Sequence, residues 1–358
     1  MSGNAKLKAV DFFCGAGGMT YGLSQAGINV LAGIDIDISC KETYEKNNPH
    51  SKFIHADIHD LSVHDFGRIT GIKRNDDSLI FVGCSPCQFW TKINTNKKKS
   101  EETKNLLEEY HRFVSYFNPA YIIIENVPGL YKNKDKNVLL PFLEFLEKNS
   151  YSYDHGLVNA NHYGVPQHRI RYSLVGTRLL KGISLPKKEY DETLILENFI
   201  GVENGFYKVK DGHKDDTDFL HTVAGLSEKN RKRIGKTPKD GGNRLSWKDD
   251  PELQINAYRD RDNIFKDVYG RMFWNKPSPT ITTRFNSLSN GRFGHPEENR
   301  AISLREGATL QSFPKTYKFT ASNMATVARH IGNAVPPEMA KRIGMEIKNK
   351  HDGRDFIG

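Results

Sequence analysis

The first half of the chain alternates short apolar runs with amphipathic stretches. Short apolar runs bounded by turn residues predict buried strands, and strands that alternate with helical patterns predict βαβ units. The predicted strands are Lys8–Phe12, Asn29–Ile34, Lys52–His55, Ser78–Val82, Tyr121–Ile124 and Ile170–Val175. The pattern therefore indicates an α/β fold built on a doubly wound, mostly parallel sheet.

Two stretches between these strands have the periodicity of amphipathic helices. The first is Met19–Ala26 and the second is Thr103–Phe117. In the second, Leu107, Tyr110 and Val114 recur three or four positions apart. This spacing places the three side chains on one face of a helix, where they can pack against the sheet.

The alternation fades from about Lys181, where Lys, Arg, Asp, Gly and Asn become frequent, and it resumes near Ala301. Such a change predicts a second, less regular domain inserted into the first. We expect a catalytic domain at residues 1–184 and a smaller domain at 185–324. Residues 325–358 are expected to form a C-terminal helix that returns to the first domain.

Length and composition suit a globular protein. The 358 residues, 37% of them hydrophobic, are enough for a large core and about two domains. No apolar run approaches the roughly 20 residues of a membrane span, and Met1–Lys8 lacks the apolar stretch of a signal peptide. We therefore expect a cytoplasmic protein with no membrane partner.

The formal charge of +9 favours a polyanionic partner, although a basic surface that serves only solubility gives the same value.

The chain has four cysteines, Cys14, Cys40, Cys84 and Cys87, and this small number does not predict a disulfide framework. Cys84 and Cys87 form a CxxC pair, which is typical of a redox dithiol or of half a zinc site. No second CxxC or neighbouring His pair supplies the other ligands of a zinc ion, so we expect no metal. The redox interpretation stays open at this point.

Candidate ligand-binding residues follow the predicted strands, because open parallel sheets bind ligands beyond the carboxyl ends of their strands. The first strand leads into Asp11–Gly18, a glycine-rich turn that suits close approach of a nucleotide-like ligand. Asp35 follows the second strand, where an acid can accept from ribose hydroxyls, and Asp57 follows the third. A tight turn without a ligand also fits. Thr20 replaces the third glycine of the dinucleotide fingerprint, which disfavours a nicotinamide cofactor.

A thiol and a carboxyl meet at the same predicted edge, since Cys87 follows the fourth strand and Glu125 follows the fifth. Each alone could be an inert buried cysteine or a helix cap, but their shared location favours a catalytic site. Period two places Arg169 and Arg171 on one face of a later strand. Two guanidinium groups suit an anionic or carbonyl-rich ligand, while an isolated pair also fits a solvated strand face.

Taken together, these segments resemble the C5 cytosine methyltransferases, most closely the bacterial restriction-modification type. The resemblance runs through most of the chain in the family's usual order, and only the stretch from about Lys181 to Tyr269 lacks a family-wide motif. The matching segments are DFFCGAGG at Asp11–Gly18, SPCQ at Ser85–Gln88, ENV at Glu125–Val127, QHRIR at Gln167–Arg171, ISLREGATLQSFP at Ile302–Pro314 and IGNAVPP at Ile331–Pro337. The sequence Phe89-Trp90-Thr91 replaces the frequent small-aromatic-Ser sequence, and His168 stands where Arg or Lys is also common, but none of these occupies a position with a chemical role.

The resemblance implies a Rossmann-like fold that uses S-adenosylmethionine as its cofactor. The positions that match the family's cofactor site are Phe13, Gly15, Gly17, Gly18, Asp35, Asp57, Asn333 and Val335. It further implies that Cys87 is the nucleophile, that Glu125 engages the target ring, and that Arg169 and Arg171 hold the cytosine and a nearby phosphate. The redox interpretation then falls, because position 84 varies in the family.

The resemblance also implies double-stranded DNA as substrate, with the target base flipped out of the duplex. Residues 185–324 would be the DNA-recognition domain. Lys97 lies in a segment that we expect to close over DNA. Candidate recognition residues, chosen because Arg and Asn can read base edges, are Arg231, Arg233, Asn243 and Arg244. We expect a monomer, with an endonuclease encoded nearby as a candidate partner.

Two alternatives follow from the same residues. An RNA cytosine methyltransferase of the same fold is the nearest, and the basic, divergent insert favours DNA over it. A DNA-binding module without catalysis is the second, and it should have lost the thiol of Cys87 or the carboxyl of Glu125.

Overall fold

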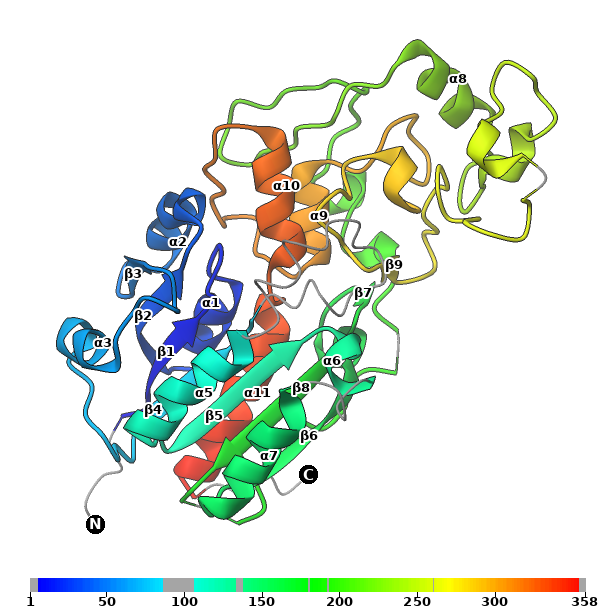
Figure 1. The fold of residues 1–358 in the computed structure, drawn as a ribbon. Helices are drawn as coiled ribbons and strands as arrows, with labels where there is room; N and C mark the ends of the chain where they lie inside the picture. The colour runs from blue at the N-terminus through cyan, green and yellow to red at the C-terminus, as the bar shows by residue number, and fades with distance from the viewer. Residues whose placement is uncertain are drawn as a thin grey trace. The chain divides into compact units, whose positions relative to one another are not determined.

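Seven strands form one central sheet, and helices cover both of its faces (Figure 1). The structure, a computed structural model, describes residues 6–85, 106–132, 138–179, 181–191, 193–259 and 261–353. The strands of the sheet are β1 (Lys8–Phe12), β2 (Asn29–Asp35), β3 (Lys52–His55), β4 (Leu79–Gly83), β5 (Tyr121–Asn126), β6 (Ser152–Asn159) and β8 (Ile170–Thr177). The helices around it are α1 (Gly18–Gln25), α2 (Lys41–Asn47), α3 (Val63–Thr70), α5 (Leu106–Phe117), α6 (Pro128–Lys132), α7 (Leu139–Lys148) and α11 (Pro337–His351).

The strand order is β3-β2-β1-β4-β5-β8-β6. The pairs among β1 to β5 are parallel, while β8 pairs antiparallel with both β5 and β6. The chain starts in the middle of the sheet, so the strand order switches direction between β1 and β4, where ligands of such folds bind. The predicted α/β class with a mostly parallel, doubly wound sheet is confirmed. Strand β6 and the antiparallel direction of β8 were absent from the prediction.

The side chains of β1 alternate between two helix layers. Val10 and Phe12 lie in the main apolar core with residues of α3, α5 and α7. The ring of Phe12 packs edge-on against Tyr110 of α5, with centroids 5.5 Å apart. Asp11, between them, lies on the opposite side, where its carboxylate meets Thr20 of α1. Figure 1 shows α5 and α7 over one face of the sheet and α11 on the other.

Helices α1 and α11 pack closely because glycines remove the side chains between them. A Cβ on Gly22 of α1 would lie 2.2 Å from the carbonyl oxygen of Pro337. A Cβ on Gly344 of α11 would lie 2.9 Å from the Cβ of Ala26. Because a real side chain cannot occupy either space, these two glycines are required for the contact.

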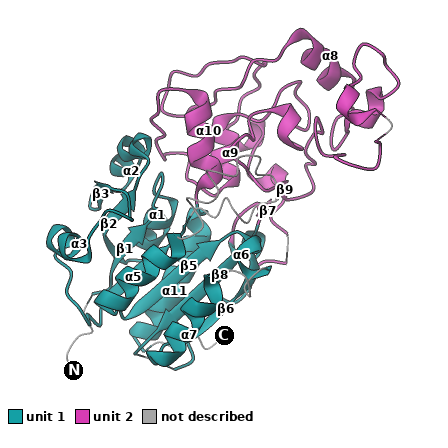
Figure 2. Ribbon diagram, viewed as in Figure 1, with its two compact units in different colours: residues 1–163, 170–189, 335–358 teal, residues 164–169, 190–334 magenta. Residues whose placement is uncertain are grey.

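The chain divides into two compact units (Figure 2). Unit 1 comprises residues 1–163, 170–189 and 335–358, and unit 2 comprises residues 164–169 and 190–334. The functional division at residues 1–184, 185–324 and 325–358 stays a prediction. Within the described residues, no helix has the length and apolar character needed to cross a membrane.

Unit 2 has little regular secondary structure. Its helices are α8 (Glu228–Lys236), α9 (Leu304–Leu310) and α10 (Met324–Asn333), and the described strands are the two-residue β7 (Gln167–His168) and β9 (Ser278–Pro279). Buried arginines link its loops instead. Arg271, which is 1% exposed, donates to the carbonyl oxygens of Ile234, Thr237 and His295 at 2.7, 3.0 and 2.9 Å.

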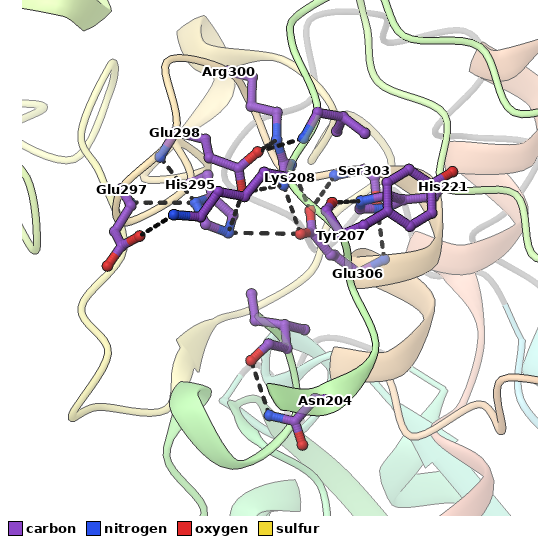
Figure 3. A network of polar contacts seen from close by, with 12 residues as sticks. Asn204, Tyr207, Lys208, His221, His295, Glu297, Glu298, Arg300, Ser303 and Glu306 are labelled. Atoms are coloured by element: carbon purple, nitrogen blue, oxygen red, sulfur yellow. Dashed lines mark hydrogen bonds and ion pairs between the residues drawn. The ribbon is translucent and has the colours of Figure 1, made fainter. Parts of the chain in front are cut away.

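A buried ion pair lies at the start of α9 (Figure 3). The guanidinium of Arg300 donates to both carboxylate oxygens of Glu306, at 2.7 and 2.8 Å. Glu306 also accepts from the backbone N–H of Ser303, and the hydroxyl of Ser303 accepts from the N–H of Glu306. This capping box fixes the first turn of α9, and the hydroxyl of Ser303 also contacts Nδ1 of His221 at 2.8 Å.

Candidate active site

The glycine-rich turn joins β1 to α1 at the carboxyl edge of the sheet. Phe13, Gly15 and Gly17 have positive φ angles of 64°, 51° and 90°, so the chain curls tightly before α1 begins at Gly18. A Cβ on Gly15 would meet no atom within 4 Å, which leaves open space beside the turn. A backbone of this shape can be approached closely by a ligand.

Asp35, the last residue of β2, is tied to this turn. Its carboxylate accepts from the N–H of Gly15 at 2.8 Å and from the N–H of Asp37 at 2.8 Å. Burial raises the pKa of Asp35, and these two N–H groups oppose that rise. The side chain of Ile36, the next residue, is 64% exposed. A carboxylate and an uncovered apolar side chain therefore lie side by side at the strand end, and sequence reasoning had not singled out Ile36.

Asp57 lies in the loop after β3, where its carboxylate accepts from the N–H of His59 at 2.9 Å. Arg112 of α5 holds the same loop by donating to the carbonyl oxygen of Ile58 at 2.7 Å and to that of Leu61 at 3.1 Å. Arg112 was absent from the sequence-based site. Arg112 is more than 50 positions from Ile58 and Leu61 in the sequence. The sequence of an amphipathic helix does not show which distant residue its arginine contacts, so this role could not be predicted.

A carboxylate and a guanidinium meet at the ends of β5 and β8. Nε of Arg171 lies 3.5 Å from Oε1 of Glu125, and both side chains are largely buried. Burial lowers the pKa of Arg171, whereas the charge of Glu125 opposes that change. Two groups predicted to act on the same base are thus brought together by the antiparallel pairing of these strands.

The motif that contains Glu125 also bonds Ser85, the first residue of the motif that contains Cys87. The amide of Asn126 donates to the carbonyl and hydroxyl oxygens of Ser85, both at 3.1 Å. Cys87 and Lys97 themselves lie outside the described residues. Cys84, the first cysteine of the CxxC pair, is inside them, and burial raises the pKa of its thiol.

Arg169 and Arg171 bind different partners, although the alternation predicted a common strand face. Strand β7 ends at His168 and β8 begins at Ile170, so Arg169 belongs to no strand. Its guanidinium, in unit 2, donates to the carbonyl oxygens of Ile281 and Ala334 at 3.2 and 3.0 Å. Arg169 is 3% exposed and fastens these two segments to each other.

The two predicted cofactor residues of the C-terminal motif belong to different units. Asn333 ends α10 in unit 2 and is exposed, and Val335 is buried in unit 1. The structure therefore describes all eight predicted cofactor positions, five of which, Phe13, Gly15, Gly17, Gly18 and Asp35, gather at the turn after β1.

Comparison with known proteins decides the family. Residues 7–349 match the model of the C-5 cytosine-specific DNA methylases. The chain belongs to this family. It is 37% identical over 351 residues to the Type II methylase M.HgiDII of Herpetosiphon aurantiacus, covering 96% of each chain. It is 30% identical over 358 residues to the Type II methyltransferase M.NgoFVII of Neisseria gonorrhoeae, covering 96% of this chain and 87% of the relative.

These relatives confirm the predicted likeness to methyltransferases of restriction-modification systems. Among solved structures, the fold resembles the Dnmt2 methyltransferase of S. pombe, with a TM-score of 0.63 and 17% identity over 97% of this chain and 99% of that one. The enzyme is therefore a DNA cytosine-C5 methylase, and the alternative of a binding module without catalysis is removed.

Two of the arginines predicted to read DNA are buried in this methylase. Arg233 is 8% exposed and donates to the carbonyl oxygens of Leu253 and Gln254. Arg244 is 3% exposed and also donates to main-chain carbonyls. Their guanidinium groups donate to main-chain carbonyls of unit 2. They therefore connect loops in this structure, and these donors are not free to bond a base edge.

The other two predicted recognition residues differ in exposure and in their contacts. Arg231 is exposed and pairs with Asp211 at 3.0 Å. Asn243 caps a short turn by accepting from the N–H of Leu245 at 2.9 Å. Arg231 thus keeps a side chain at the surface of unit 2, and its contact with DNA stays a prediction.

Proposed function

We propose that this methylase modifies one specific cytosine in double-stranded DNA, with S-adenosylmethionine as methyl donor, through base flipping and a covalent bond between Cys87 and C6. We further propose that it acts as a monomer in a restriction-modification system with an endonuclease encoded nearby. The observation that supports the catalytic part is the contact of Glu125 with Arg171 at the strand ends. Asn126 ties Ser85, two positions before Cys87, to that same edge.

The residues at the carboxyl edge fit the proposed cofactor. S-adenosylmethionine, when bound, supplies an electrophilic methyl group on a sulfonium. The open backbone at Gly15 suits its close approach, and we expect the carboxylate of Asp35, which is tied to this turn, to accept from ribose hydroxyls. Ile36 offers an apolar surface and Asp57 an acceptor for the adenine. Phe13, Gly17, Gly18, Asn333 and Val335 would complete the binding site.

The proposed chemistry divides among three side chains. The thiolate of Cys87 adds to C6 of the flipped cytosine, which makes C5 nucleophilic enough to accept a methyl group. A protonated Glu125 donates to N3, and the guanidinium of Arg171 donates to O2, so that both stabilise the charge that develops on the ring. A base then removes the proton from C5, and the sulfur leaves C6 by elimination.

The first test identifies the methylated site and then traps the covalent complex. Bisulfite sequencing of DNA from a methylation-free host that expresses the chain should reveal one methylated sequence. A duplex with 5-fluorocytosine at that cytosine should give a complex that survives denaturing electrophoresis. Fluorine cannot leave as a cation, so elimination is blocked after methyl transfer and the bond to sulfur persists.

Matched variants assign the nucleophile and the acid. Cys87→Ala should abolish the complex while Cys84→Ala retains it, because the motif needs only the second thiol. Glu125→Gln should slow methyl transfer by about 10²–10⁴-fold, as expected for loss of an acid catalyst. A complex that persists in Cys87→Ala would overturn the assignment of the nucleophile. Absence of any methylated cytosine would count against the proposed activity.

A further inference from the structure

Two neighbouring apolar side chains protrude from a loop of unit 2. Ile264 is 42% exposed and Phe265 is 63% exposed. Phe265 also has a positive φ of 49°, a left-handed conformation that bulky residues rarely adopt. A large aromatic residue held at the surface in an unfavourable backbone conformation indicates that surrounding contacts impose its position.

Arg244 supplies those contacts. Its buried guanidinium donates to the carbonyl oxygens of Arg261 and Ile264, both at 2.7 Å, and of Phe265 at 3.3 Å. The guanidinium carbon also lies 4.9 Å from the centroid of the Tyr258 ring, and that ring is 6.1 Å from the ring of Phe265. The loop is therefore held from beneath while Ile264 and Phe265 point outward.

The charges around the tip favour a polyanion. Asp262 pairs with Lys248 at 2.9 Å, and Asp267 pairs with Arg292 at 2.8 Å. These two acids are thus neutralised within unit 2. Arg261 and Lys266, which flank the apolar pair, are exposed, and within the described residues neither lies within 4.0 Å of a carboxylate. The hydrogen bond from Lys248 lowers the pKa of Asp262, and the charge of Lys266 helps to lower it.

We propose that Ile264 and Phe265 form an apolar wedge that inserts between base pairs of duplex DNA, with Arg261 and Lys266 on the flanking phosphates. Proteins that bend or open DNA use apolar side chains in this way, and the unstacking they cause is offset by added contacts. A second copy of the chain is a poorer occupant, because the cations around a small apolar tip would face each other. The proposal rests on the proposed function only in that DNA is the substrate.

The test uses methyl transfer to plasmid DNA grown in a methylation-free host. Phe265→Ala should raise the KM for the plasmid about tenfold and leave kcat within about twofold, since the wedge contributes to binding DNA. Phe265→Leu should stay near wild type because it keeps an apolar side chain. Val202→Ala removes another apolar side chain of unit 2, 55% exposed, and should have no effect.

Salt dependence and coupling separate a wedge from a charge contact or a structural role. The slope of log KM against log salt should stay unchanged in Phe265→Ala but fall by about one in Lys266→Ala, which removes one phosphate contact. Arg244→Ala should add little to Phe265→Ala, because both remove the same wedge. The thermal unfolding midpoints of Phe265→Ala, Phe265→Leu and Lys266→Ala should equal that of Val202→Ala. The midpoint of Arg244→Ala should be lower, because this variant loses hydrogen bonds that hold the loop.

Three results would overturn the proposal. The first is a KM of Phe265→Ala equal to that of Val202→Ala. The second is an unchanged salt slope in Lys266→Ala together with a lowered slope in Phe265→Ala. The third is self-association in sedimentation that Phe265→Ala abolishes. Filter binding of the same plasmid reports the wedge even if no methyl transfer occurs, so failure of the proposed function is recognised separately.

Discussion

Asp11 is a carboxyl that the fold keeps away from water, one residue before the end of β1. It is fully buried, and burial raises its pKa to about 7 against the opposing hydrogen bond from Thr20. The hydroxyl of Thr20 donates to its Oδ2 at 2.7 Å and contacts the hydroxyl of Tyr44 at 3.1 Å. Tyr44 in turn contacts the hydroxyl of Ser51 at 2.6 Å. The turn after β1 is therefore supported by a buried chain of polar groups.

This arrangement makes stability depend on pH. Because the pKa of Asp11 in the folded chain, about 7, lies above its ordinary value of 3.8, its contribution to stability is complete below pH 3.8. That contribution is lost as the pH rises through 7. We expect Asp11→Asn to be nearly insensitive to this change, so the difference in unfolding free energy between wild type and variant should shift in favour of the variant from pH 5 to pH 8.

Urea denaturation followed by circular dichroism at several pH values measures this difference. Asp60→Asn, at an exposed carboxyl of the loop after β3, is the control and should follow the wild type. Parallel curves for wild type and Asp11→Asn between pH 5 and pH 8 would mean that Asp11 titrates in the folded chain as it does in water.

Single residues were predicted well where they follow strands and poorly where they do not. The turn after β1 and Asp35 come together as expected, because the ends of adjacent parallel strands share one edge. Arg169 was predicted to share a strand face with Arg171, and the alternation could not reveal the break at residue 169 between β7 and β8. The environment of such a residue depends on chain segments more than 100 positions away, such as Ile281.

Helix α5 holds the loop of Asp57 through one arginine side chain. Arg112 donates to two carbonyl oxygens of the loop, at Ile58 and Leu61, and also bonds Glu109 within α5 at 2.8 Å. The loop carries no helix or strand of its own between His55 and Val63. The position of Asp57 therefore depends on α5.

We expect Arg112→Ala to raise the KM for S-adenosylmethionine about tenfold with little change in kcat, because charge-assisted hydrogen bonds that order the loop are lost. In an Asp57→Ala background the same change should have less than about a twofold effect, since the loop then has no carboxylate to position. Initial rates of methyl transfer measure both. Arg68→Ala on α3, where the side chain is 80% exposed, should leave the KM unchanged. Additive effects of Arg112→Ala and Asp57→Ala would contradict the coupling.

Most strands of the sheet and the parallel direction of β1 to β5 were predictable, whereas β6 and the antiparallel direction of β8 were not. Local apolar runs gave β1 and β3 with their observed bounds and the others within two residues. Strand β6 escaped because Ser152–Asn159 carries Asp, His and Gly and lies at the sheet's edge, half exposed, where apolar residues are not required. Strand β8 runs antiparallel to both β5 and β6, and no local pattern encodes these two pairings.

Over the whole chain, the buried arginines that link the loops of unit 2 are the feature that the sequence predicted least well. The polar composition of unit 2 predicted an irregular domain but not the burial of its charged side chains, and Arg271, Arg300 and Arg305 are fully buried. Arg305 donates to the carbonyl oxygens of Asp218 and Tyr317 at 3.1 and 2.9 Å. Arginines of this unit were predicted to contact DNA because a guanidinium can read a base edge, and only the three-dimensional structure shows which guanidinium groups are used internally.

The ion pair of Arg300 and Glu306 should dominate the stability of unit 2. Burial alone would raise the pKa of Glu306, but the charge and hydrogen bonds of Arg300 lower it to about 2. Glu306→Gln should reduce the unfolding free energy by about 3–5 kcal/mol, because a buried guanidinium then loses its counter-charge. Glu297→Gln, at an exposed carboxylate 3.9 Å from Lys208, should change it by less than about 0.5 kcal/mol.

Thermal and urea denaturation of the two variants test this difference. The stabilisation from Glu306 is present above its ordinary pKa of 4.5 and is lost as the pH falls towards 2, so the gap between wild type and Glu306→Gln should narrow in acid. Equal stabilities of the two variants at neutral pH would show that Arg300 is adequately paired by Glu298 alone, which it contacts at 3.0 Å.

The glycine-mediated packing of α1 against α11 also governs when the enzyme can first work during its synthesis. At about 5–20 residues per second, the stretch from Gln25 to Pro337 takes roughly 15–60 s to translate. Throughout that interval α1 has been synthesised but the helix that covers Gly22 has not. A nascent chain therefore cannot complete unit 1 until α11 has been made. A premature stop codon before Pro337 would yield a polypeptide in which unit 1 is incomplete.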